Sequence, residues 1–153
     1  MGKLQDLTEG FQLQYEKFLH GCDAVEMDGN WDVYESGDME TYYFNDMLCL
    51  ILHLTSVDGE FSDTEADFVN AMFGSEYTAK ELADIYQSEK KDIQNMVQVE
   101  IPADYRRLKT INEGLADHFK EMLFSICEII SESDGIVKNA EQDIIGQLHS
   151  QLD

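Results

Sequence analysis

Four acidic side chains recur at one fixed spacing in two separate parts of the chain. Asp58 stands seven residues before Glu65, and Asp134 stands seven residues before Glu141. In both places a glycine directly follows the aspartate. Carboxylate oxygens are the ligands that Ca²⁺ and Mg²⁺ prefer in proteins, whereas ligation by oxygen alone disfavours zinc and copper. These four residues are therefore candidate ligands for Ca²⁺ or Mg²⁺.

The two motifs belong to a longer internal repeat. A shift of 76 residues superposes residues 47–72 on residues 123–148. Each copy has the pattern of an apolar helix, an Asp-Gly turn, an apolar loop residue and a second helix that begins near an acid. We therefore predict two helix hairpins, over about residues 43–74 and 119–150. Apolar residues meet apolar residues throughout: Leu50 with Ile126, Leu54 with Ile130, Phe61 with Val137, Phe68 with Ile144, Val69 with Ile145 and Met72 with Leu148.

A purely structural role also explains most of the motif. Gly59 and Gly135 can adopt the left-handed backbone conformation that ends a helix. A glutamate in the first turn of the next helix favours that helix through capping and through the helix dipole. The motif by itself leaves the structural role and the cation site open.

The spacing of glycine and glutamate also matches part of the EF-hand calcium loop. With the glycine at position 6, the glutamate falls at position 12. Position 1, which should be aspartate, is then Leu54 or Ile130, and position 3 is Ser56 or Glu132. Because both loops lack the first ligand, we do not expect an EF-hand. A cation held between the two loops would have a different geometry and stays possible.

Residues 48–65 and 125–141 resemble the TerB-like family of tellurite-resistance proteins. The shared pattern is an apolar helix, a small residue before Asp-Gly, and an acid-rich helix start, all occurring twice. The two segments together comprise 35 of the 153 residues. The resemblance implies an all-α domain with pseudo-twofold symmetry, in which the two hairpins pack together. It also implies an acidic cluster that binds divalent metal, and a role in stress responses with membrane-associated partners.

The residues that match the family motif are the same four carboxylates, Asp58 and Glu65 in the first copy and Asp134 and Glu141 in the second. The second copy departs from the pattern, because Lys138 stands where Ser62 stands in the first copy. A lysine beside a carboxylate site weakens cation binding by its charge. This favours a structural role for the second copy, with Asn139 as its alternative helix cap.

The periodicity of apolar residues predicts an all-α, compact single domain over residues 1–153, with about seven helices. Gly21 is expected to end the first helix, and Ile101-Pro102 to interrupt the chain. Residues 21–40 are expected to form an acidic loop, which Trp31, Val33 and Tyr34 pin to the core. Thr78 and Glu81 have the spacing of a capping box, as do Ser62 and Glu65. The expected helices cover about residues 4–20, 40–57, 62–73, 78–97, 102–113, 115–132 and 139–151.

The charge is large and uneven. The formal net charge is -22, and no lysine or arginine occurs between Lys17 and Lys80. Such a field repels phosphate, so binding to nucleic acid and to anionic membranes is disfavoured. A basic protein partner or a cation fits better, although an acidic surface can also serve solubility alone.

No signal peptide and no membrane-spanning run is recognisable, and the three cysteines lack a CxxC pair, so we expect a cytoplasmic protein. No known catalytic motif occurs, and we expect no enzymatic activity. Two functions follow. The first is a binding module that holds a divalent cation at the paired Asp-Gly turns. The alternative is a metal-free adaptor that docks a basic or membrane-associated protein through its acidic N-terminal half. The oligomeric state stays open.

Overall fold

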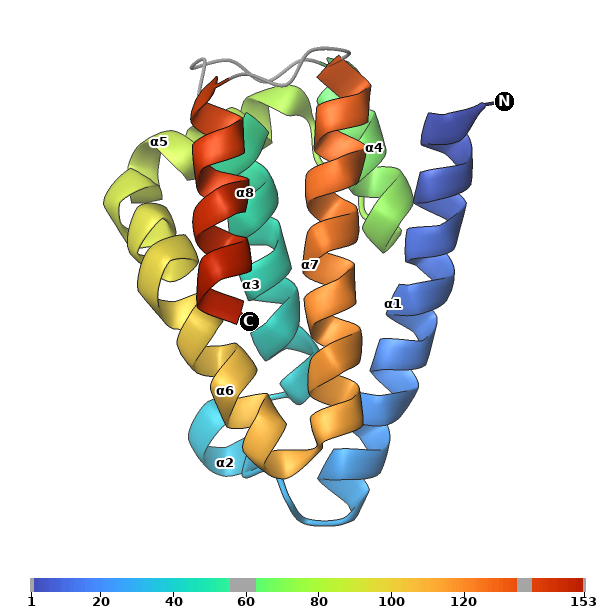
Figure 1. Ribbon diagram of the computed structural model, residues 1–153, viewed down its shortest axis with the longest axis vertical. Coiled ribbons are helices and arrows are strands. Elements are labelled where there is room, and N and C mark those ends of the chain that lie inside the picture. Colours follow the sequence, from blue (N-terminus) through green and yellow to red (C-terminus); the bar gives the residue numbers. More distant parts are fainter. Residues whose placement is uncertain (1, 56–62, 135–138, 153) are drawn as a thin grey trace.

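The computed structural model of the chain describes residues 2–55, 63–134 and 139–152, and within these ranges every regular element is a helix (Figure 1). The predicted all-α class is confirmed, and the predicted number of about seven helices is close. The elements are α1 (Lys3–Met27), α2 (Val33–Ser36), α3 (Met39–Thr55), α4 (Asp63–Phe73), α5 (Ala79–Asn95), the π-helix η1 (Met96–Glu100), α6 (Ile101–Ile111), α7 (Glu113–Asp134) and α8 (Asn139–Leu152).

Helices α3 and α7 form the centre of the bundle. α7 lies between α1 and α8 in Figure 1 and packs against α1, α3 and α6. Helix α3 carries apolar side chains on more than one face, and seven of its large residues are fully buried: Met39, Tyr43, Met47, Leu50, Ile51, Leu52 and Leu54. Burying each such side chain stabilises the fold by about 1.5–3 kcal/mol. The prediction that this segment is a central, buried helix is confirmed.

The prediction that Gly21 ends the first helix is wrong. α1 continues to Met27, and the left-handed Gly29, with φ of +76°, follows its last turn. Gly21 lies instead where α1 passes close to α7, since a Cβ atom there would come within 2.5 Å of Leu115 Cδ1. The missing side chain thus serves the packing of two helices rather than a turn.

The expected interruption at Ile101-Pro102 is also absent. α5, η1 and α6 follow one another without a loop from residue 79 to residue 111, with a kink at Glu89 and a change to π-helical form just before Pro102. Proline has no N–H to donate to the carbonyl group four residues earlier, that of Gln98. The Gln98 carbonyl oxygen accepts a hydrogen bond from Gln151 Nε2 at 3.1 Å. A side chain of α8 therefore binds the backbone of this irregular stretch, four residues before Pro102.

One of the two predicted capping boxes is confirmed. Thr78 Oγ1 accepts a hydrogen bond from the Glu81 N–H at 3.1 Å, and Glu81 Oε1 accepts one from the Thr78 N–H at 3.1 Å. The other box depends on Ser62, which lies outside the described residues.

The described ends of the two predicted hairpins lie at the same end of the bundle. Thr55 ends α3 and Asp63 begins α4, while Asp134 ends α7 and Asn139 begins α8; all four lie at the top of Figure 1. The first helices of the hairpins, α3 and α7, pack together. Among the described helices, none combines the length and the apolar character that crossing a membrane requires.

The hydrogen bond from Gln151 to the Gln98 carbonyl group can be tested by the variant Q151A. We expect the free energy of unfolding to fall by about 0.5 kcal/mol, the lower end for a hydrogen bond, because the acceptor at this exposed site can bind water instead. Urea unfolding at neutral pH measures the change. Gln147, an exposed glutamine on the same helix, gives the control Q147A. Equal stability of the two variants would contradict the role of Gln151.

Candidate functional site

The four predicted cation ligands are only partly described. Glu65 lies in the first turn of α4 and is half-buried. Asp134 is the last residue of α7, and Glu141 lies in the first turn of α8, but their side chains are outside the described part, as is the whole of Asp58. Among the side chains that are described, no three His, Cys, Asp or Glu are grouped to hold a metal ion. The cation site at the Asp-Gly turns stays a prediction.

A second acidic region lies at the other end of the bundle. It combines the last turns of α1, the short helix α2 and the start of α3, at the bottom of Figure 1. The predicted loop over residues 21–40 is therefore largely helical. We call this region the acidic end and define it by seven carboxylates, of which five are exposed and two are half-buried: Asp23, Glu26, Asp28, Asp32, Glu35, Asp38 and Glu40.

Trp31 fixes the connection between α1 and α2. Its side chain is 4% exposed, and its Nε1 donates a hydrogen bond to the Gly37 carbonyl oxygen at 3.0 Å. The next residue, Asp32, caps α2, because its Oδ1 accepts hydrogen bonds from the N–H groups of Tyr34 and Glu35 at 3.0 and 3.1 Å. A buried indole ring and a capped helix thus give this acidic segment a defined shape.

Arg107 of α6 holds the same connection from outside. Its guanidinium carbon lies 4.1 Å from the centre of the Trp31 ring and 5.5 Å from that of Tyr42. Its Nη2 also donates a hydrogen bond to Ser36 Oγ at 3.1 Å. Cation–π contacts of a partly desolvated arginine contribute about 1–2 kcal/mol. The arginine thereby joins the acidic end to the second half of the chain.

Two tyrosines continue this network into the core. Tyr42 Oη donates to Asp104 Oδ1 at 2.6 Å, and Tyr43 Oη donates to the Asp104 carbonyl oxygen at 3.0 Å. Asp46 and Asp104 are 1% and 5% exposed. Burial, followed by a hydrogen bond with Asp104, raises the pKa of Asp46 far above its ordinary value, so Asp46 carries a proton at neutral pH. Because both carboxyl groups are closed to solvent, a substrate cannot reach them, and we assign the pair a structural role.

The exposed face of the acidic end is partly apolar. Met27 is 87% exposed and Tyr34 is completely exposed, while Val33 is 43% exposed. The prediction that Trp31, Val33 and Tyr34 all pin this segment is thus correct for Trp31 and wrong for the other two. Isolated exposed apolar residues are ordinary, but a fully exposed tyrosine among carboxylates is typical of a contact residue.

Among the described residues, no ion pair joins a carboxylate of the acidic end to a basic side chain. The ion pairs Lys3–Glu132 and Lys80–Asp84 lie on other surfaces. Partial burial, a hydrogen bond with Asp23 and the surrounding acids raise the pKa of Glu40 to about 7. Burial and the same acids raise the pKa of the Cys22 thiol to about 12. Burial is the largest cause of both pKa shifts, and the concentrated negative field of the neighbouring acids adds to it.

Comparison with protein-family models, with curated proteins and with solved structures gives no match for this chain. The resemblance to the TerB-like family is therefore carried by the two Asp-Gly motifs alone, and the function has to be argued from the residues themselves.

The shifted pKa of Glu40 makes stability depend on pH. Because this pKa is higher in the folded chain than the ordinary value of 4.5, folding takes up a proton. The stabilisation is complete below about pH 4.5 and is lost as the pH rises through about 7. Glu40 contributes about 1–2 kcal/mol to the free energy of unfolding at low pH. This figure is reduced for screening by solvent and for the proton that Glu40 shares with Asp23.

The variant E40Q mimics the protonated carboxyl group. We expect it to match the original protein near pH 5 and to melt at a higher temperature near pH 8. Glu35 is exposed at the same end, and E35Q should leave the pH profile unchanged apart from a small uniform shift. A pH profile of the melting temperature that is identical for E40Q and the original protein would disprove this assignment.

Proposed function

We propose that this chain is a non-enzymatic binding module that docks a basic protein segment on its acidic end. The observation that carries the proposal is the completely exposed Tyr34, which stands on a capped helix among carboxylates that make no ion pair with the lysines and arginines the structure describes. Tyrosine is enriched among the residues that contribute most to binding energy at protein interfaces.

The shape of the acidic end supports this role. Trp31, the Asp32 cap and Arg107 order the segment before any partner arrives. A surface that is already ordered loses less conformational entropy on binding than a flexible acidic loop would. Its negative potential also accelerates the encounter with a positively charged partner.

The chemistry of the surface defines the partner. Seven carboxylates attract lysine and arginine, and Tyr34 and Met27 offer an aromatic and a thioether side chain for apolar contact. The partner segment should therefore combine basic residues with aliphatic or aromatic ones. Nucleic acid carries the wrong charge for this surface.

A peptide in which arginine alternates with leucine, labelled with fluorescein, tests this proposal by fluorescence anisotropy. We expect binding that weakens as the salt concentration rises. The variant Y34A should weaken binding roughly three- to tenfold, as expected for a central aromatic contact residue. Leu13 is also exposed, on the middle of α1, and L13A provides the matched control for loss of an exposed apolar side chain.

Equal affinity of Y34A and L13A would overturn the assignment to the acidic end. Deleting residues 22–38 is a poorer test, because it removes the buried side chains of Cys22, Val25 and Trp31. Point substitutions of exposed residues keep the core intact, so a loss of binding can be ascribed to the surface.

A divalent cation at the Asp-Gly turns is a second proposal. Two observations support it. α3 and α7 end, and α4 and α8 begin, at the same end of the bundle, and Glu65 lies in the first turn of α4. Two carboxylate-bearing turns at one end would repel each other, and bound Ca²⁺ or Mg²⁺ would relieve this repulsion.

This second proposal predicts that millimolar Ca²⁺ or Mg²⁺ raises the melting temperature. At an ion concentration about 100 times the dissociation constant, the gain is roughly 2–3 kcal/mol. The double variant D58N/D134N should lose this gain, whereas D28N/E35Q, which removes two charges at the acidic end, should keep it. A melting temperature that divalent ions leave unchanged in the original protein would reject the cation site.

A further inference from the structure

A groove separates the middle of α3 from the second half of α5. Its volume is about 280 Å³, close to the lower limit of small-molecule pockets, which are roughly 300–1,000 Å³. The groove lies on helices that contribute nothing to the acidic end except the first turn of α3. Nine residues line it: Asn45, Leu48, Cys49, Leu52, Ile85, Glu89, Asp92, Ile93 and Met96.

The irregular path of α5 accompanies the groove. Glu89 breaks the helical geometry with φ of -123° and ψ of 23°, and the chain becomes π-helical from Met96 onward. Both irregular points are among the lining residues. π-helical turns inserted in helices occur frequently at functional sites, where they change the direction in which side chains point.

The interior of the groove is apolar. Leu48, Leu52 and Ile93 form its buried floor, and the half-buried side chains of Ile85 and Met96 form its walls. A predominantly apolar recess with a few polar groups at its edge is the usual composition of a ligand pocket. The body of a ligand that fits here is therefore apolar.

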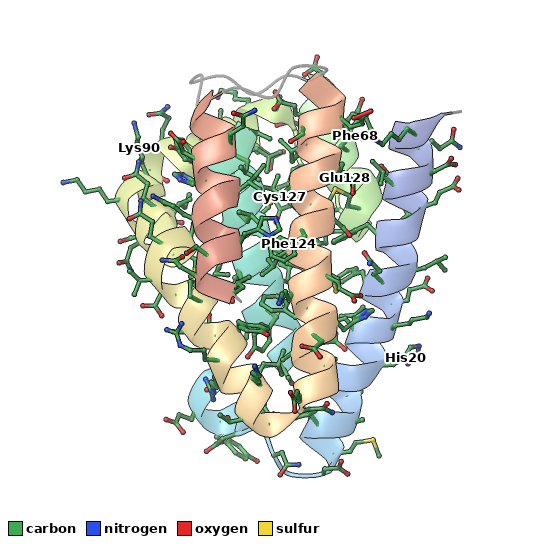
Figure 2. The ribbon with its side chains drawn as sticks, in the orientation of Figure 1. His20, Phe68, Lys90, Phe124, Cys127 and Glu128 are labelled. Atoms are coloured by element: carbon green, nitrogen blue, oxygen red, sulfur yellow. The ribbon has the colours of Figure 1, made fainter. Side chains whose placement is uncertain are left out.

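The polar groups of the groove are acidic. Glu89 and Asp92 lie one helical turn apart on α5 and are exposed, and Asn45 of α3 adds an amide. The intervening Lys90 points away from the bundle in Figure 2, and its Nζ lies 6.0 Å from the centre of the Tyr86 ring. No lysine, arginine or histidine is among the lining residues, so the charged groups that border the groove itself are carboxylates, while Lys90 and Lys91 lie outside its lining.

Cys49 lies in the same groove, and its pKa reflects the burial and the charge there. Of the three cysteines, all of which are described, it alone is half-buried, while Cys22 and Cys127 are buried. Burial raises the pKa of Cys49 to about 11, with smaller contributions from Glu89 and from Asp46, which is itself ionised only in that alkaline range. The field of Glu89 therefore reaches into the groove and would act on a bound cation.

We propose that this groove binds a small organic cation with an apolar body, such as an aryl- or alkylammonium ion. The apolar part lies over Leu48, Leu52 and Ile93, and the ammonium group lies at the edge between Glu89 and Asp92. This proposal is independent of protein docking at the acidic end, because the two surfaces share no residue.

Chemical modification of Cys49 tests the proposal. The rate at which iodoacetamide alkylates Cys49 is measured by mass spectrometry at about pH 8, with and without 2-phenylethylammonium. We expect the cation to slow alkylation in a saturable manner. The uncharged analogue 2-phenylethanol has nearly the same shape and should protect with an affinity roughly three- to tenfold lower, the difference expected from one or two exposed charge contacts.

The double variant E89Q/D92N should bind the cation and the alcohol with equal affinity. Each alkylation rate is compared with that of the same variant without ligand. The control D117N/E121Q removes two exposed charges from α7 and should keep the preference for the cation. Circular dichroism verifies that both variants fold. Equal protection by the two compounds in the original protein, a preference that persists in E89Q/D92N, or no protection by the cation would each overturn the proposal.

Discussion

The acidic end depends on a cation that its own part of the chain does not contain. Residues 18–79 include 14 acids and neither lysine nor arginine, so a basic group has to come from elsewhere in the sequence. Arg107 of α6 supplies it by lying against the rings of Trp31 and Tyr42 and donating to Ser36. Because the guanidinium group contacts aromatic faces and a hydroxyl group, it adds positive charge without covering the exposed carboxylates. The acidic surface is thereby attached to the bundle and stays open to a partner.

Protons relieve the remaining repulsion where no base is near. Asp46 is buried beside Asp104 and holds a proton, since two buried carboxyl groups in contact cannot both ionise without a large cost in free energy. Glu40 shares a hydrogen bond with Asp23 and its pKa is raised to about 7. The chain thus uses an arginine from α6 at one point and bound protons at two others. The exposed carboxylates of the acidic end remain accessible to a binding partner.

The sequence predicts what depends on periodicity and on local capping. The central helix α3, the capping box of Thr78 and Glu81, and the all-α class all follow from spacing along the chain. Prediction from the sequence fails where contact with a distant segment determines the local structure. Gly21 has the pattern of a helix end, but its neighbour is Leu115, 94 positions away. Pro102 has the pattern of an interruption, but the π-helix η1 leads without a loop into α6, and Gln151 of α8 binds the backbone of η1 at Gln98. The pairing of Asp46 with Asp104 and the groove at Glu89 likewise join residues that no local pattern connects.

Charge alone cannot give this protein specificity. A net charge of -22 attracts every cation, and the attraction between exposed groups falls off within about 10 Å at 0.1 M salt. Selection therefore has to come from shape at the places where apolar and acidic groups meet. At the acidic end the apolar element projects, since Tyr34 is completely exposed, and it suits an extended partner that can surround the ring. In the groove of α3 and α5 the apolar element is recessed, with Leu52 and Ile93 on the floor, and it suits a ligand small enough to enter. The same charge would thus serve both proposed binding surfaces, whose occupants would differ in size.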